Sequence, residues 1–159
     1  MNNLFPVVGV VGAGAMGRGI AQLAVQAGSR VYLHDANAET AAAACQAVVG
    51  QWQHMAEKGR IDAARLQAWT GQLAPADGLS RLADCNLVIE AIVERLDAKQ
   101  ALLRDLEALL PPGAALASNT SSLSVTALGA CLQRPQRLAG LHFFNPAPVM
   151  KLVEVVPGL

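Results

Sequence analysis

The feature that most constrains this chain is a glycine-rich segment between a strand pattern and a helix pattern. Residues 7–11 form a short β-branched run, typical of strands covered on both faces in a parallel sheet. Residues 12–17 read Gly-Ala-Gly-Ala-Met-Gly, and apolar side chains then recur at helical spacing as far as Ala27. Gly28 is a helix-ending residue, and residues 30–35 read as a second strand. Strand, helix and strand in this order predict a βαβ unit.

The glycines match the GxGxxG pattern of dinucleotide-binding loops. Gly12 would turn the chain, Gly14 would let backbone N–H groups approach a pyrophosphate, and Gly17 would allow the helix to pack closely on the strand. The first helical turn, at Ala15 and Met16, offers unpaired N–H groups and the positive end of the helix dipole. The alternative is a tight turn with no ligand.

An acidic residue stands where such a loop needs one. Asp35 ends the second strand 23 residues after Gly12, close to the spacing of about 20 residues expected for the acid that binds the adenosine ribose. A carboxylate there would repel a 2′-phosphate, so the sequence favours NAD over NADP as the cofactor. The alternative for Asp35 is an ordinary polar residue at a strand end.

The rest of the chain also alternates helical and extended patterns. A helical pattern covers 38–58, and Asp62 is a candidate N-cap for a second helix reaching Leu73, so a helical hairpin is expected over about 38–73. Further strands are predicted over 87–91, 114–117, 138–144 and 152–156, and further helices over 96–110 and 124–131. We expect an α/β fold: a doubly wound, Rossmann-type, mostly parallel sheet with the inserted hairpin and antiparallel strands near the C-terminus.

Composition narrows the classes of protein further. The 159 residues suit one domain, and 53% hydrophobic with 15% charged residues exclude intrinsic disorder. Twelve basic and twelve acidic residues give zero net charge, so we expect no nucleic-acid partner. No apolar stretch approaches the roughly 18 residues of a membrane span, so no membrane partner is expected.

The cysteines predict neither a disulfide framework nor a metal site. Cys45, Cys85 and Cys131 are odd in number, far apart and without CxxC spacing. We expect three buried thiols in a reduced cytoplasm. His34 and His54 have no comparable setting and are expected to be structural.

Four longer motifs follow one another along the chain. They are GAGAMGRGIA at 12–21, VIEAIVE at 88–94 with Lys99, SNTSSL at 118–123 and HFFNPAPVMKLVEVV at 142–156. Together they resemble the N-terminal domain of L-3-hydroxyacyl-CoA dehydrogenases, above all the bacterial 3-hydroxybutyryl-CoA type, which includes members acting on 3-hydroxyadipyl-CoA in phenylacetate degradation. The resemblance implies an oxidoreductase of fatty acid metabolism and β-oxidation that converts L-3-hydroxyacyl-CoA to 3-oxoacyl-CoA with NAD.

The resemblance implies a catalytic pair at His142 and Glu154. These residues flank the bend at 145–148, so two neighbouring strand ends could bring imidazole and carboxylate together. His142 would remove the proton from the 3-hydroxyl while hydride leaves C3 for the nicotinamide, and Glu154 would orient the ring and stabilise the imidazolium. Without the resemblance, a satisfied core histidine is an equal alternative for His142.

Four further site residues follow from the resemblance. Ser121 would contact the substrate oxygen and the cofactor, Asn145 would lie near the nicotinamide, and Glu94 and Lys99 would be cofactor contacts. From chemistry alone, a hydroxyl and an amide in loops after strands suit hydrogen bonding to a hydroxyl, carbonyl or carboxamide. Residues of these types also favour turns and caps, which is the alternative for Ser121 and Asn145.

Members of this family carry a helical C-terminal domain that supplies further substrate contacts and most of the dimer interface. We expect residues 1–159 to be the NAD-binding domain, the C-terminal domain to be absent from this chain, and the full-length form to be a homodimer. Two alternatives stay open. One is another β-hydroxyacid dehydrogenase, against which HFFNP followed by Glu154 argues, and the other is a non-catalytic module that binds NAD or a partner protein.

Overall fold

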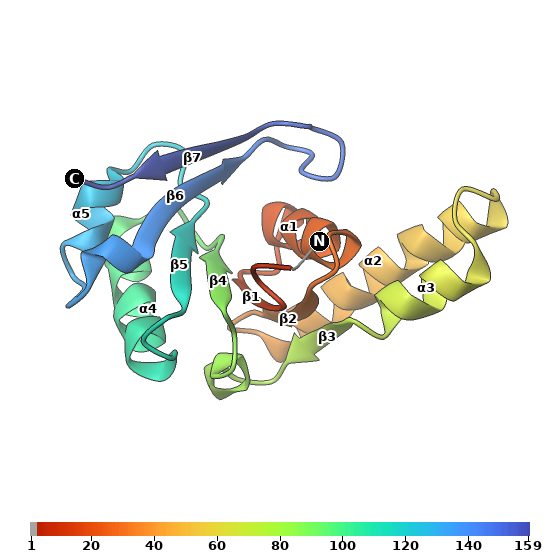
Figure 1. Ribbon diagram of the computed structural model, residues 1–159, viewed down its shortest axis with the longest axis horizontal. Helices are drawn as coiled ribbons and strands as arrows, with labels where there is room; N and C mark the ends of the chain where they lie inside the picture. Colours follow the sequence, from red (N-terminus) through yellow and green to blue (C-terminus); the bar gives the residue numbers. More distant parts are fainter. Residues whose placement is uncertain (1–2) are drawn as a thin grey trace.

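The computed structural model describes residues 3–159, in which seven strands form one sheet (Figure 1). The sheet order is β3-β2-β1-β4-β5-β6-β7; all neighbours pair in parallel except β6 and β7, which are antiparallel. The strands are β1 (Val7–Val11), β2 (Arg30–His34), β3 (Leu73–Ala76), β4 (Leu87–Glu90), β5 (Ala115–Ser118), β6 (Leu138–Phe143) and β7 (Val153–Pro157). The strand order reverses between β1 and β4, the place where such sheets bind ligands.

Helices cover both faces of this sheet. They are α1 (Ala15–Gln26), α2 (Ala38–Glu57), α3 (Ala63–Thr70), α4 (Leu96–Leu109) and α5 (Val125–Gly129). One buried cluster joins α1 and α2 to the sheet through Ile20, Leu33 and Trp52, and a second joins α4 and α5 to the opposite face through Leu103 and Leu128. The predicted doubly wound α/β fold is therefore confirmed. Among residues 3–159, no helix has both the length and the apolar character of a membrane span.

The predicted helical hairpin is confirmed but shorter than expected. The Asp62 side chain accepts a hydrogen bond of 2.7 Å from the Arg65 N–H and so caps α3. The prediction was wrong for Leu73, which begins β3 opposite Val31 instead of continuing the helix. Pro75 explains the difference, since proline disfavours helical backbone before it and is tolerated on an edge strand.

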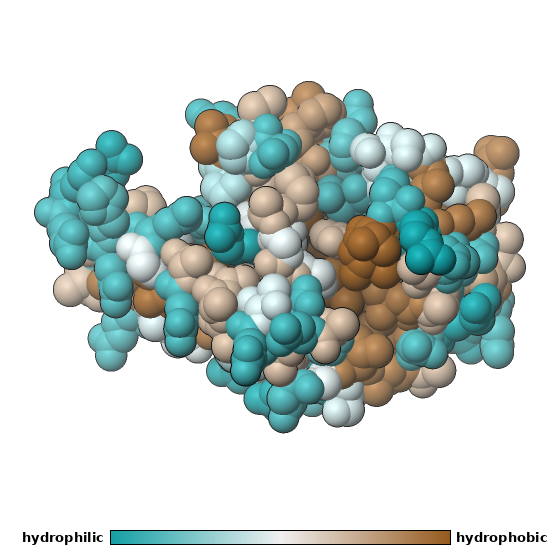
Figure 2. Space-filling view, turned by 180° about the vertical axis from the view of Figure 1, so that it is seen from behind, coloured by the Kyte–Doolittle hydropathy of each residue, from teal (hydrophilic) through white to brown (hydrophobic). Residues whose placement is uncertain are grey.

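The α2–α3 hairpin extends away from the sheet (Figure 1). Trp52 is fully buried on α2 and packs against Trp69 of α3, with ring centroids 5.4 Å apart. Seen from behind, the outer end of the hairpin is hydrophilic (Figure 2), in agreement with the exposed residues 57–60 at its turn. The two helices of the hairpin are thus held together by aromatic packing, and the turn between them is solvated.

Candidate active site and cofactor loop

The glycine loop connects β1 to α1 and its three glycines have different environments. Gly12 has φ of +103°, and a Cβ there would lie 2.5 Å from the carbonyl oxygen of Ala91. A Cβ on Gly17 would overlap the carbonyl oxygen of Gly12. A Cβ on Gly14 would meet no atom within 4 Å. The fold itself therefore requires Gly12 and Gly17, whereas Gly14 faces open space where a ligand can approach.

The start of α1 is open to an anion. No side chain caps this helix, and its first turn contains no acidic residue. By contrast, α2 is capped by the Asn37 side chain, which accepts a hydrogen bond of 2.9 Å from the Glu39 N–H. Uncapped N–H groups and the helix dipole at Ala15 and Met16 suit a pyrophosphate.

Asp35 lies beside the glycine loop, immediately after β2. Its Oδ2 accepts a hydrogen bond of 2.9 Å from the Ala13 N–H, and its Oδ1 accepts one of 3.0 Å from the Asn37 N–H. These bonds orient the carboxylate and leave lone pairs on both oxygens for hydroxyl donors such as those of a ribose. The predicted loop and acid are brought together, and their geometry fits NAD.

His142 and Glu154 are directly opposite each other on β6 and β7. The His142 Nδ1 lies 3.0 Å from Glu154 Oε2, and the His142 side chain is 22% exposed. Since a carboxylate accepts, Nδ1 carries the proton and Nε2 is left as a proton acceptor. The ring also packs at a tilt against Phe144, with centroids 4.6 Å apart. This arrangement suits a general base.

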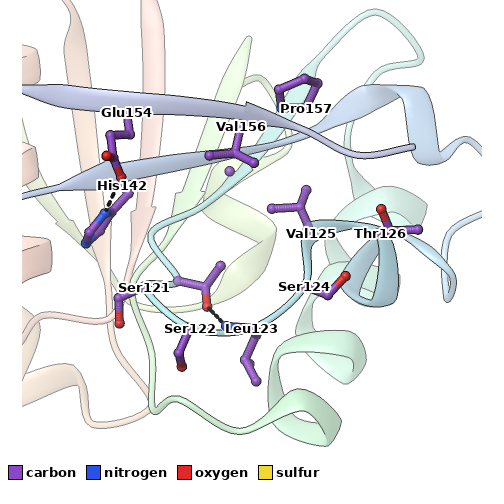
Figure 3. A pocket seen from close by; sticks show the side chains of 12 residues that line it. Ser121, Ser122, Leu123, Ser124, Val125, Thr126, His142, Glu154, Val156 and Pro157 are labelled. Atoms are coloured by element: carbon purple, nitrogen blue, oxygen red, sulfur yellow. Dashed lines mark hydrogen bonds and ion pairs between the residues drawn. The ribbon is translucent and has the colours of Figure 1, made fainter.

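A cavity of about 330 Å³ opens between the turn after β5 and the β6–β7 pair (Figure 3). Ser121, His142 and Glu154 line it together with hydroxyl-bearing and apolar side chains. None of the hydrogen bonds found among residues 3–159 uses the Ser121 hydroxyl, which is exposed. A free hydroxyl and an oriented imidazole thus face one cavity.

Asn145 lies on the loop after β6 and is exposed, outside the lining of this cavity. The loop rests on α1, because Ala147 is buried and a Cβ on Gly19 would lie 3.1 Å from the Ala147 Cβ. The structure therefore places Asn145 between the cavity strand β6 and the cofactor helix α1. Its contact with a nicotinamide stays a prediction.

Glu94 and Lys99 are joined to each other and differ in exposure. Glu94 is 37% exposed, whereas Lys99 is buried with its Nζ 3.3 Å from Glu94 Oε2. Burial raises the pKa of Glu94, but hydrogen bonds from Thr120 and Ser122 and the charge of Lys99 outweigh this effect and lower the pKa to about 2. Contact of either side chain with a cofactor stays a prediction.

Two buried polar residues near the site were not predicted from the sequence. Glu90 ends β4 and Ser118 ends β5, and both side chains are fully buried. The signal was present in VIEAIVE, where a glutamate interrupts an apolar strand and a lysine follows nine residues later. Such a glutamate needs a buried cation, because an unpaired charge in the core is costly.

His34 and the three cysteines lie outside the cofactor loop and the cavity. Burial lowers the pKa of His34, although Asp35 opposes the shift, and burial raises the pKa values of Cys45 and Cys85 to about 11. The prediction of three buried thiols was wrong for Cys131, which is half-buried because it lies in the turn after α5, beyond the part of the helix that packs into the core. Residues 3–159 contain no group of three or more potential metal ligands.

A parallel sheet with this strand order, a glycine loop at its switch point and an acid after β2 defines a dinucleotide-binding domain of the dehydrogenase type. The chain belongs to the 3-hydroxyacyl-CoA dehydrogenase family: residues 7–159 match the family model described as "3-hydroxyacyl-CoA dehydrogenase, NAD binding domain". The resemblance and the NAD cofactor predicted from the sequence are thereby confirmed.

Several relatives and solved structures are similar to this chain. It is 45% identical to the 3-hydroxyadipyl-CoA dehydrogenase of Escherichia coli over 96% of this chain and 32% of that protein, and 43% identical to a probable 3-hydroxybutyryl-CoA dehydrogenase of Bacillus subtilis over 94% and 52%. The crystal structure of (S)-3-hydroxybutyryl-CoA dehydrogenase from Ralstonia eutropha superposes with a TM-score of 0.92 at 34% identity, over 98% of this chain and 55% of that one. The chain thus spans from 32% to 55% of the length of these relatives.

Proposed function

We propose that the protein containing this domain oxidises L-3-hydroxyacyl-CoA to 3-oxoacyl-CoA with NAD. The observation that carries the proposal is the cross-strand pair of His142 and Glu154, which faces a cavity also lined by Ser121. The glycine loop and Asp35 support the NAD dependence of the reaction, because their geometry fits a dinucleotide.

Each site residue has a separate role in the proposed oxidation. His142 Nε2 accepts the proton of the 3-hydroxyl, and the Glu154 carboxylate stabilises the imidazolium through Nδ1. The Ser121 hydroxyl donates a hydrogen bond to the substrate oxygen. NAD, when bound, supplies the acceptor for the hydride from C3, so the products are 3-oxoacyl-CoA, NADH and a proton. Asn145 orients the nicotinamide from the loop after β6.

The substrate and setting belong to the same proposal. The relatives are named for 3-hydroxyadipyl-CoA and 3-hydroxybutyryl-CoA, which supports an acyl-CoA substrate. We propose β-oxidation or phenylacetate degradation as the setting of this reaction. We further propose that residues 1–159 are followed in the functional protein by a helical C-terminal domain, and that this protein is a cytoplasmic homodimer. The relatives' greater length supports the additional domain.

Turnover tests the proposal directly. The 159 residues are joined to the C-terminal half of the Bacillus subtilis relative, and NADH oxidation is measured with acetoacetyl-CoA. We expect turnover that His142→Gln lowers about 100-fold or more, with unchanged NADH affinity. His54→Gln, on the exposed side of α2, is the matched control. NADH binding without turnover in the unmutated protein would instead favour a non-catalytic module.

A further inference from the structure

A buried charge cluster lies at the carboxyl ends of β4 and β5. Glu90 and Ser118 are fully buried, and Lys99 is 1% exposed. The Lys99 Nζ donates to both Glu90 carboxylate oxygens, at 2.9 and 2.8 Å, and the Ser118 hydroxyl donates to Oε1. The Ile92 N–H adds a hydrogen bond of 3.1 Å to Oε2. The Glu90 carboxylate therefore has partners on both oxygens, which offsets the cost of removing it from water.

Lys99 extends this cluster to the turn that carries Ser121. Its Nζ lies 3.3 Å from Glu94 Oε2, and the other oxygen of Glu94 collects donors from the turn. The Thr120 hydroxyl donates to Oε1, as do the N–H groups of Ser121 at 3.1 Å and Ser122 at 3.2 Å. The Glu94 carboxylate thus holds the Ser121 backbone and is itself held by a buried cation.

The same turn is fastened at two other points. The Ser118 hydroxyl, which donates to Glu90, accepts a hydrogen bond of 3.2 Å from the Thr120 N–H. The Asn119 Oδ1 accepts one of 2.9 Å from the Phe143 N–H, and Phe143 follows His142 on β6. The turn therefore connects the buried cluster to the strand that carries the proposed base.

We propose that Glu90, Lys99 and Glu94 are positioning residues that set the place of Ser121 relative to His142. This inference rests on the proposed function, in which Ser121 meets the substrate oxygen. It assigns Lys99 a task inside the protein, because its ammonium is buried and already bonded to two carboxylates. Direct contact with the cofactor is not needed for either Lys99 or Glu94 to affect turnover.

The first test follows the backbone of the turn in the 159-residue chain by NMR. Glu94→Gln removes the charge but keeps the size, so we expect the amide proton signals of Ser121 and Ser122, whose N–H groups donate to Glu94, to shift. Asp97→Asn is the matched control, because Asp97 is an exposed carboxylate in the first turn of α4, three residues after Glu94, and pairs with Arg95. Unmoved amide signals of Ser121 and Ser122 in folded Glu94→Gln would overturn the proposal.

A paired substitution tests the buried part. Lys99→Met together with Glu90→Gln removes both charges at once, which avoids leaving one of them unpaired in the core. We expect the Ser121 and Ser122 amide signals to shift in the same direction as in Glu94→Gln. Unchanged signals in a folded paired variant would refute the link through Lys99. If this variant does not fold, Glu94→Gln alone decides between the two outcomes above.

The second test is a double-mutant cycle in the 159 residues joined to the C-terminal half of the Bacillus subtilis relative. We expect Glu94→Gln to lower kcat about tenfold when Ser121 is present, and less than twofold when Ser121→Ala has removed the positioned hydroxyl. Independent, multiplicative losses would overturn the positioning role. Absence of any acetoacetyl-CoA turnover in the unmutated protein refutes the proposed function instead, and the NMR test still decides whether the cluster holds the turn.

Discussion

Replacing single glycines by alanine separates what the fold requires from what the cofactor requires. Gly17→Ala puts a methyl group into the carbonyl of Gly12, 2.8 Å from its carbon. The β1–α1 turn must open to relieve this overlap, and overpacking of a tight site costs about 3 kcal/mol at the upper end of the usual range. In a protein of this size that loss lowers Tm by roughly 6–12 °C.

Gly14→Ala should leave stability nearly unchanged and weaken cofactor binding. Its new methyl group meets no protein atom within 4 Å, and the backbone at Gly14, with φ of −68°, accepts alanine. The loss of a favourable N-cap residue and the stiffening of the unfolded chain nearly cancel, so stability changes by about 0.5 kcal/mol or less. The methyl group stands where the pyrophosphate approaches, and we expect NADH affinity to fall about tenfold, or ~1.4 kcal/mol.

The assay combines thermal unfolding with fluorescence titration of NADH for each variant of the 159-residue chain. Gly50→Ala is the control, because Gly50 is an exposed glycine inside α2 with no atom near its Cβ position. It should stabilise the protein by about 0.5–1 kcal/mol and leave NADH binding unchanged. NADH binding by Gly14→Ala as tight as that of the unmutated chain, or unfolding of Gly17→Ala at the unmutated temperature, would contradict these separate roles of the two glycines.

Three further substitutions test the site. Asp35→Ala should weaken NADH binding and reduce the preference of the chain for NADH over NADPH, which parallel titrations with both nucleotides would measure. An undiminished preference for NADH would contradict the assignment of Asp35 to the adenosine ribose. Glu154→Gln should lower acetoacetyl-CoA turnover about tenfold or more without changing NADH affinity, because the imidazolium loses its counter-charge; equal kcat would reject the pair. Since the pKa of Glu94 is lowered from 4.5 to about 2, its ionised form contributes stability above pH 4.5 that is lost as the pH falls toward 2. After allowance for solvent screening, this contribution to the free energy of unfolding is about 1–2 kcal/mol. Urea unfolding of the unmutated chain and of Glu94→Gln should therefore give free energies of unfolding that differ at pH 7 and converge at pH 2.5. An equal difference at the two pH values would contradict this prediction.

The segments whose geometry depends on neighbouring residues could be predicted from the sequence. The buried run of β1, the glycine loop and the spacing to Asp35 each depend on residues close in the chain, so their pattern predicted the βαβ unit and NAD binding, both of which are confirmed. Asp62 was predicted as an N-cap for the same reason, since capping depends on the next three residues.

Contacts between segments far apart in the chain became visible in the folded structure. The strand β3 exists because an edge of the sheet accepts Pro75, which a helical periodicity could not reveal. The resemblance implied a catalytic pair at His142 and Glu154. The two residues lie opposite each other because of the register of β6 against β7. A glutamate within an apolar strand indicates that a buried cation is needed, but its pairing with Lys99 depends on how α4 packs behind β4. Spacing along a chain sets backbone geometry, whereas the order and register of a sheet set which distant charges meet.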